Sequence, residues 1–177
     1  MITGNFPVNA FEKIDTPFYY YDMDVLRQTL DAVKKAAPET NFHVHYAIKA
    51  CATIEVLRAI AEAGLGADCV SGGEVKAALA AGVPASKIVF AGVAKTDREI
   101  KLALENDIYC FNVESTQELE VISALAHAMS KTARVCLRIN PNVDAHTHAK
   151  ITTGLNENKF GIQMNDMLSV IRLAHTL

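Results

Sequence analysis

One unit of sequence recurs three times: an apolar run, then a serine or threonine, then a glutamate three residues further on. The three polar signatures are Ser71-Gly-Gly-Glu74, Thr96-Asp-Arg-Glu99 and Ser115-Thr-Gln-Glu118. In such a capping box, the hydroxyl and the carboxylate satisfy backbone N–H groups that a helix leaves free in its first turn. Each copy therefore predicts a strand that leads directly into a helix.

The apolar runs that we interpret as strands cover residues 42–48, 66–70, 87–91, 108–113 and 134–140. We expect a helix after each of the first four, with Thr53 capping the first of these helices, and a last helix from Asn165 onward. Alternating helices and nearly continuous apolar strands indicate a parallel sheet covered by helices. No G-x-G-x-x-G fingerprint follows the first strand, which favours a (β/α) barrel over a nucleotide-binding open sheet.

The length of the chain limits how much of a barrel it can build. An eight-unit barrel needs about 250 residues, and these 177 residues supply only five or six units. An arc of five strands leaves two open sheet edges. The chain is therefore either an open sheet complete in itself or part of a longer protein. The last helix ends without a glycine cap, which favours a fragment.

The beginning of the chain follows a different pattern. We expect a loop over residues 1–15 and a strand over the aromatic run of residues 16–21. Asp22 can cap a helix that runs to about Ala37, where Pro38 would stop it. We therefore divide the chain into a lead-in, residues 1–40, and a partial barrel, residues 41–177.

Composition argues against several classes of function. The net charge of −3 provides no basic field for nucleic acid. No apolar run approaches the roughly 20 residues that span a bilayer, and residues 1–10 lack the pattern of a secretory signal. The four cysteines form no C-x-x-C pair, so we predict no metal site. Cys69, Cys110 and Cys136 are interpreted as buried apolar residues of a cytoplasmic protein.

Lys49 stands at the end of the first of the five apolar strands, just before a helix. Functional groups gather at the carboxyl ends of strands in α/β folds. An amine held half out of water there loses its proton more easily and can attack a carbonyl carbon. The position alone fits an ordinary surface lysine as well.

The segment Tyr46-Ala-Ile-Lys49-Ala-Cys resembles the pyridoxal-lysine motif of the fold-type III decarboxylases, which include ornithine and arginine decarboxylases. Three further stretches are similar to the diaminopimelate decarboxylase family: GADCVSGGE at residues 66–74, LRINPNVDAH at residues 137–146 and ITTGLNENKFGI at residues 151–162. The resemblance extends from about Thr16 to the end of the chain.

The resemblance implies a (β/α)8 TIM-type barrel of the alanine racemase-like kind, with about the first five or six β/α units present. It assigns residues 16–21 to a second, β-rich domain. It also implies decarboxylation of meso-2,6-diaminopimelate to L-lysine, with pyridoxal 5′-phosphate joined to Lys49 as a Schiff base, in a homodimer with shared active sites. The family's phosphate loop, ring-stacking histidine and pyridine-nitrogen acid lie beyond Leu177. We therefore expect this segment alone to be inactive.

Two more residues are assigned to the cofactor site. The resemblance places Asp68 near the cofactor, in the charge network of Lys49; its alternative role is bonding to nearby backbone. Arg138 ends the fifth strand, where a charge costs several kcal/mol unless it is paired. We expect a carboxylate such as Asp68 beside it, and a plain structural ion pair is the alternative to a role in the site.

Three further candidates have a structural explanation beside the functional one. Glu74 is fully explained as a capping glutamate, although the resemblance places it near the site. For Lys159 the resemblance suggests an ion pair at a dimer interface near the site, and the alternative is a solvated loop lysine. His146, together with His148 and Asp144, has the type and spacing of metal ligands. No fourth ligand is evident, so we interpret these histidines as residues that order the loop.

Other functions stay open at this point. A small pyridoxal phosphate-binding protein of cofactor homeostasis shares the lysine-bearing strand but would lack the D-A-H-T-H loop and the lead-in strand. A metal-dependent hydrolase could use His43 and His45, which face one side of the first strand, although they precede its carboxyl end. Among the decarboxylases, ornithine, arginine and carboxynorspermidine are alternative amino-acid substrates.

Overall fold

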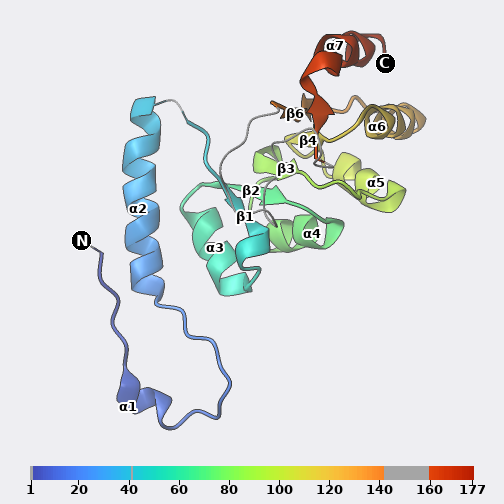
Figure 1. Ribbon diagram of the computed structural model, residues 1–177. Helices are drawn as coiled ribbons and strands as arrows, with labels where there is room; N and C mark the ends of the chain where they lie inside the picture. The colour runs from blue at the N-terminus through green and yellow to red at the C-terminus, as the bar shows by residue number, and fades with distance from the viewer. Residues whose placement is uncertain (1, 41, 142–159) are drawn as a thin grey trace.

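The computed structural model describes residues 2–40, 42–141 and 160–177, apart from the side chains of residues 38–40. At its centre lies a five-stranded parallel sheet whose strands stand in sequence order (Figure 1). The strands are β1 (His45–Ala47), β2 (Gly66–Cys69), β3 (Ile88–Phe90), β4 (Cys110–Val113) and β5 (Val135–Leu137). All five expected strands are therefore present, each shorter than its apolar run.

A helix follows each of the first four strands and leads to the next parallel strand. These helices are α3 (Ile54–Glu62), α4 (Gly72–Ala80), α5 (Asp97–Glu105) and α6 (Thr116–Ala128). Neighbouring helices contact one another in the same order, along one side of the sheet (Figure 1). A strand order that never reverses is the winding of a (β/α) barrel, whereas a doubly wound sheet reverses at a switch point. The chain is thus a partial TIM-type barrel.

The fifth expected strand, residues 134–140, is divided at Arg138. Its second part, β6 (Ile139–Asn140), pairs in parallel with β7 (Ile162–Gln163). The N–H of Arg138 donates to the carbonyl of Val113, whereas the carbonyl of Arg138 accepts from the N–H of Ile162. The prediction of one continuous strand is therefore wrong, because the backbone stops pairing with β4 at Arg138 and begins to pair with β7. The turn η3 (Met164–Asp166) and α7 (Met167–Thr176) follow, as the expected last helix.

The core lies between the sheet and the helices. Phe90 and Phe111 are almost fully buried there, with ring centroids 6.1 Å apart. Side chains from three helices complete this layer, among them Val75, Ile100 and Ile122. Burying each large apolar side chain contributes about 1.5–3 kcal/mol. This layer therefore provides most of the apolar burial that fixes the sheet.

The opposite side of the sheet, here called the inner face, carries several polar groups. Register partners that alternate with the core residues define it: Ala47, Asp68, Val89 and Cys110 across β1 to β4, and Asn112 and Cys136 across β4 and β5. Cys69 is buried, as expected, but Cys110 is half-buried and Cys136 is exposed. The interpretation of all three as buried is wrong because Cys110 and Cys136 lie on the inner face, away from the helices.

The lead-in contains a short helix, α1 (Val8–Phe11), and a long one, α2 (Met23–Thr40). Asp22 caps α2 as expected: its Oδ1 accepts the backbone N–H groups of Asp24 and Val25, both at 3.1 Å. The expectation that Pro38 stops the helix is wrong: α2 continues to Thr40, although proline has no N–H to donate to the carbonyl four residues earlier. α2 packs through Leu30 against α3.

Residues 16–21 form no strand within the described part of the chain. A strand needs a neighbouring strand to bond to its backbone, and the described residues provide none there. The expected strand is therefore wrong for this chain by itself, and its pairing in a second, β-rich domain stays a prediction. No helix among residues 2–40, 42–141 and 160–177 is long and apolar enough to cross a membrane.

The three predicted capping boxes differ in how they close. The second, at residues 96–99, closes in both directions. In the other two, the serine accepts from the glutamate's backbone N–H at 3.2 Å, as expected. The carboxylates, however, reach one residue further back: Glu74 accepts from the N–H of Val70, and Glu118 from that of Glu114, both at 2.7 Å. These two glutamates therefore fasten the residue that precedes the cap.

Candidate active site

Lys49 lies in η1 (Ile48–Ala50), a single 3-10 turn that directly follows β1. Ile48 is 1% exposed and anchors this turn in the core. Lys49 itself is exposed rather than half-buried as expected. Its amine has no hydrogen-bond or ion-pair partner in the described part of the chain. The amine is therefore open to solvent.

Asp68 lies on β2, beside Ala47 of β1. Its Oδ1 is buried without a hydrogen-bond partner among the residues that the structure describes. Loss of hydration raises the pKa of Asp68 above its usual value, while the charges of Lys49, His45 and Arg138 oppose that rise. Buried polar atoms in proteins nearly always have partners, so this oxygen marks a place where a polar group of a ligand fits.

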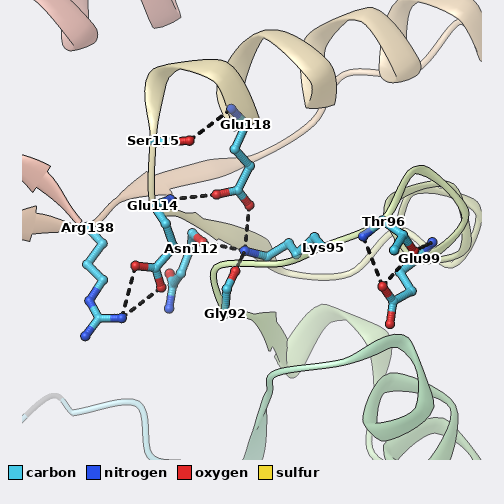
Figure 2. Close-up of polar contacts among 9 residues, drawn as sticks. All are labelled: Gly92, Lys95, Thr96, Glu99, Asn112, Glu114, Ser115, Glu118 and Arg138. Atoms are coloured by element: carbon cyan, nitrogen blue, oxygen red, sulfur yellow. Dashed lines mark hydrogen bonds and ion pairs between the residues drawn. The ribbon is translucent and has the colours of Figure 1, made fainter. Parts of the chain in front are cut away.

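Arg138 pairs with Glu114 rather than with Asp68. Its Nη1 lies 2.8 and 3.1 Å from the two carboxylate oxygens of Glu114, and Figure 2 shows the two charged ends facing each other. The expected carboxylate partner is confirmed, but its identity is wrong. Glu114 directly follows β4, the neighbour of β5, whereas β3 and β4 separate Asp68 from Arg138. The guanidinium carbon also lies 5.0 Å from the ring centroid of Phe160.

A buried lysine that the sequence did not single out supports this edge of the sheet. The side chain of Lys95, in the β3–α5 turn, is only 1% exposed. Its Nζ donates to the carbonyls of Gly92 and Asn112, at 2.7 and 2.9 Å, and lies 2.6 Å from Glu118 Oε1 (Figure 2). The other carboxylate oxygen of Glu118 holds the N–H of Glu114. Lys95 is thus joined to Arg138 through two glutamates.

The other candidate residues stand as follows. The carboxylate of Glu74 has a capping role, as the bond to Val70 shows, and a role near a cofactor stays a prediction. His146 and Lys159 lie outside the described residues, as does the D-A-H-T-H loop. Nothing in the sequence pattern distinguished Glu114, because a glutamate before a helix cap is usually solvated.

The two histidines of the hydrolase hypothesis lie at the other end of β1. His43 is exposed, and His45 has a buried Nδ1 without a partner among the described residues. A cavity of about 640 Å³ at this amino-terminal edge is lined by both histidines and by Gly66, Lys87 and Tyr109, among others. The described residues contain no group of three or more His, Cys, Asp or Glu side chains that could hold a metal ion.

Cys51, two residues after Lys49, connects the lead-in to the site. Its Sγ lies 3.3 Å from Thr53 Oγ1 and 3.4 Å from Tyr21 Oη. These two hydroxyl groups lower the pKa of the Cys51 thiol. Thr53 occupies the N-cap of α3 as expected but makes no capping bond with its side chain. By contrast, burial raises the pKa of the Cys69 thiol to about 12.

Comparison with known proteins identifies the class. Residues 23–177 match the family described as "Pyridoxal-dependent decarboxylase, pyridoxal binding domain". Diaminopimelate decarboxylase of Bacteroides thetaiotaomicron is 60% identical over 97% of this chain and 45% of its own length. That of Haemophilus influenzae is 48% identical over 94% of this chain and 40% of its own length.

A solved structure agrees with this match. The crystal structure of diaminopimelate decarboxylase from Helicobacter pylori, complexed with L-lysine, superposes with a TM-score of 0.87 and 40% identity. The alignment covers 95% of this chain and 43% of that one. The chain therefore belongs to the pyridoxal-dependent decarboxylases, and residues 23–177 match their pyridoxal-binding domain. It spans less than half the length of these relatives.

The residues at the carboxyl edge of the sheet fit an aldehyde cofactor with a charged ring. Lys49 offers an unpaired amine, and Asp68 offers a buried carboxyl oxygen without a partner. A covalent bond needs the first, and a hydrogen bond or charge pair satisfies the second. We find no other buried, unpartnered side-chain oxygen among the described residues.

Proposed function

We propose that this chain is the cofactor-binding part of a diaminopimelate decarboxylase, and that the whole protein converts meso-2,6-diaminopimelate to L-lysine and carbon dioxide. The observation that carries this proposal is the 60% identity with a relative of that name over 97% of the chain. Two further relatives, which match 94% and 87% of this chain, bear the same name, and the Helicobacter pylori enzyme was crystallised with L-lysine, the product of this reaction.

Three residues of this chain hold pyridoxal 5′-phosphate in the proposal. Lys49 joins it covalently through its amine, as its place at the end of β1 and its free Nζ support. Asp68 offers its unpaired Oδ1 to a polar group of the bound molecule. Arg138 supplies positive charge from the other side of the inner face, and Glu114 holds it there.

The chain's residues have separable tasks in this chemistry. When bound, the cofactor accepts the electron pair that the departing carbon dioxide leaves behind. The Lys49 amine would hold the cofactor through its aldehyde group until the substrate binds. Because the pKa of Asp68 is raised, its carboxyl group can hold a proton at a higher pH than an ordinary aspartate. A carboxyl with such a pKa is suited to exchanging a proton with a bound ring or amine.

The remaining expectations belong to the whole protein. We propose a cytoplasmic homodimer in which active sites are shared between subunits, with Lys159 in an ion pair at the interface and His146 near the site. Residues 16–21 would join a second, β-rich domain, and Glu74 would combine its capping role with a place beside the cofactor. The match over less than half of each relative leaves room for the phosphate-binding and substrate-binding groups.

The test starts from the covalent bond. Pyridoxal phosphate is added to the whole protein and the absorbance band of the bound cofactor is recorded. The complex is then reduced with borohydride and mapped by mass spectrometry. We expect the reduced adduct on the peptide that contains Lys49. Lys49→Ala should lose both signals, and the exposed control Lys101→Ala should keep them. An adduct that persists in Lys49→Ala would refute the assignment.

The second step identifies the reaction. Carbon dioxide release is measured with meso-diaminopimelate, ornithine and arginine under identical conditions. We expect turnover of diaminopimelate above the other two substrates. A protein that binds the cofactor through Lys49 but decarboxylates none of them would be a cofactor carrier. Preference for ornithine or arginine would move the assignment to another decarboxylase.

A further inference from the structure

Glu114 is a carboxylate whose side chain is 96% shielded from solvent, being only 4% exposed. It is not part of any motif that the resemblance assigns, and it directly follows β4 at the edge where Lys49 lies. Burying an ionised carboxylate costs several kcal/mol unless it is paired and hydrogen-bonded. The buried Glu114 carboxylate therefore depends on its pairing with the Arg138 guanidinium.

A hydrogen bond to Glu118 fixes the backbone of Glu114. Its N–H donates to Glu118 Oε2 at 2.7 Å, and Glu118 Oε1 lies 2.6 Å from Nζ of Lys95, which is buried (Figure 2). Ser115, the next residue, caps α6 and accepts the N–H of Glu118 at 3.2 Å. Carbonyl bonds to the β3–α5 turn and to β4 immobilise Lys95 in turn. The carboxylate therefore starts from a fixed position.

Glu114 occupies only one corner of the Arg138 guanidinium. Both carboxylate oxygens contact the same nitrogen, Nη1. Arginine carries five N–H donors in a planar fork, and Nε and Nη2 have no partner among the described residues. The Arg138 side chain is 42% exposed, and its charge acts on Asp68 across the inner face. The unused donors are thus available on the side of the candidate site.

We propose that Glu114 is a positioning residue of this site: it holds Arg138 by one nitrogen so that the remaining donors face the bound cofactor. The inference rests on the proposed function, because it needs a cofactor at Lys49. Without Glu114, the guanidinium is free to take other rotamers over Phe160, and ordering it again on binding costs free energy. Cofactor affinity then falls although Glu114 never touches the cofactor.

A double-mutant cycle on the whole protein tests this. Pyridoxal phosphate is titrated into wild type, Glu114→Ala, Arg138→Ala and the double variant, and dissociation constants are read from the absorbance band. Because Glu114 acts through Arg138, we expect Glu114→Ala to weaken binding by about tenfold in the wild-type background. In the Arg138→Ala background the same change should have less than about a twofold effect. Glu114→Gln, which keeps an oxygen acceptor for Nη1, should bind more tightly than Glu114→Ala.

A control separates positioning from folding. Glu99→Ala removes another edge glutamate that caps a helix but does not touch Arg138, so it should lower the melting temperature without changing cofactor affinity. Glu114→Ala binding like wild type, or weakening equally in both backgrounds, would overturn the inference while leaving the proposed function intact. If Glu114→Ala does not fold, the same cycle is run with Glu114→Gln, and the inference again requires that its effect on cofactor affinity is smaller in the Arg138→Ala background. A wild-type protein that binds no cofactor would instead remove the proposed function and this inference with it.

Discussion

Replacing Lys95 by methionine tests whether a buried charge supports the carboxyl edge of the sheet. Methionine has a similar volume, so the change removes the ammonium group without leaving a large cavity. The substitution removes three contacts of the Lys95 amine, with the carbonyls of Gly92 and Asn112 and with the carboxylate of Glu118, all within 2.9 Å. Glu118, whose side chain is 13% exposed, is then left without its cation.

The expected loss of stability follows from these contacts. Removing one partner of a buried ion pair costs about 3–5 kcal/mol, because the remaining charge is uncompensated. Two features place Lys95→Met at the lower end of that range. Glu118 keeps its bond from the N–H of Glu114, and some water reaches its carboxylate. We therefore expect a decrease of about 3 kcal/mol in the free energy of unfolding, measured by urea denaturation followed by circular dichroism.

Two controls show whether the charge is the cause. Lys101→Met, on the exposed face of α5, should change stability by less than about 0.5 kcal/mol. Lys95→Met combined with Glu118→Gln should be more stable than Lys95→Met alone, because no unpaired charge is left buried. A loss below about 1 kcal/mol for Lys95→Met, or a double variant less stable than the single one, would refute the reasoning.

Two further predictions concern neighbouring turns and the candidate site. Gly72→Ala should lower the stability of the fold by about 1–3 kcal/mol, because the added Cβ would lie 2.6 Å from Glu99 Cγ. Gly73→Ala is the control: its added Cβ would have its nearest contact at 3.6 Å, so it should be neutral or stabilising. Thermal melts of both variants test this. The raised pKa of Asp68 means that its ionised form costs stability at neutral pH, and this cost is relieved as the pH falls through the folded pKa. Asp68→Asn should therefore melt above wild type at pH 7, and that advantage should shrink towards pH 4; an advantage that does not depend on pH would contradict the shift.

Much of the fold followed from local chemistry in the sequence. Strand, cap and helix signals coincide at residues 66–74 and 108–118, and the structure has a parallel strand and a helix at each. The pattern predicted less well where the outcome depends on distant parts of the molecule. Residues 16–21 have the composition of a strand but no neighbour to pair with among the described residues. Cys136 lies in an apolar run, yet it is exposed, because its register with Asn112 places it on the inner face and not on the face that the helices cover.

The candidate site was predictable only in part. The position of Lys49 after a buried strand was evident, and so was the need of Arg138 for a carboxylate. Which carboxylate it takes depends on which strands are neighbours, and the sheet order selects Glu114 over Asp68. Lys95 could not be distinguished by type or spacing, because a lysine in a turn is usually solvated. Its burial results from three acceptors that meet only after folding.

At the carboxyl edge of the sheet, glutamates in the first turns of the helices hold the neighbouring strand-to-helix turns in place. Glu99 closes its own cap and also accepts the N–H of Gly72, at the start of the preceding helix, at 2.8 Å. Glu118 does the same in the next turn by holding Lys95 and the N–H of Glu114. Two carboxylates thereby join the three turns that lead into α4, α5 and α6. These bonds use neither the amine of Lys49 nor the Oδ1 of Asp68, and both groups have no partner among the described residues, as the proposed cofactor site requires.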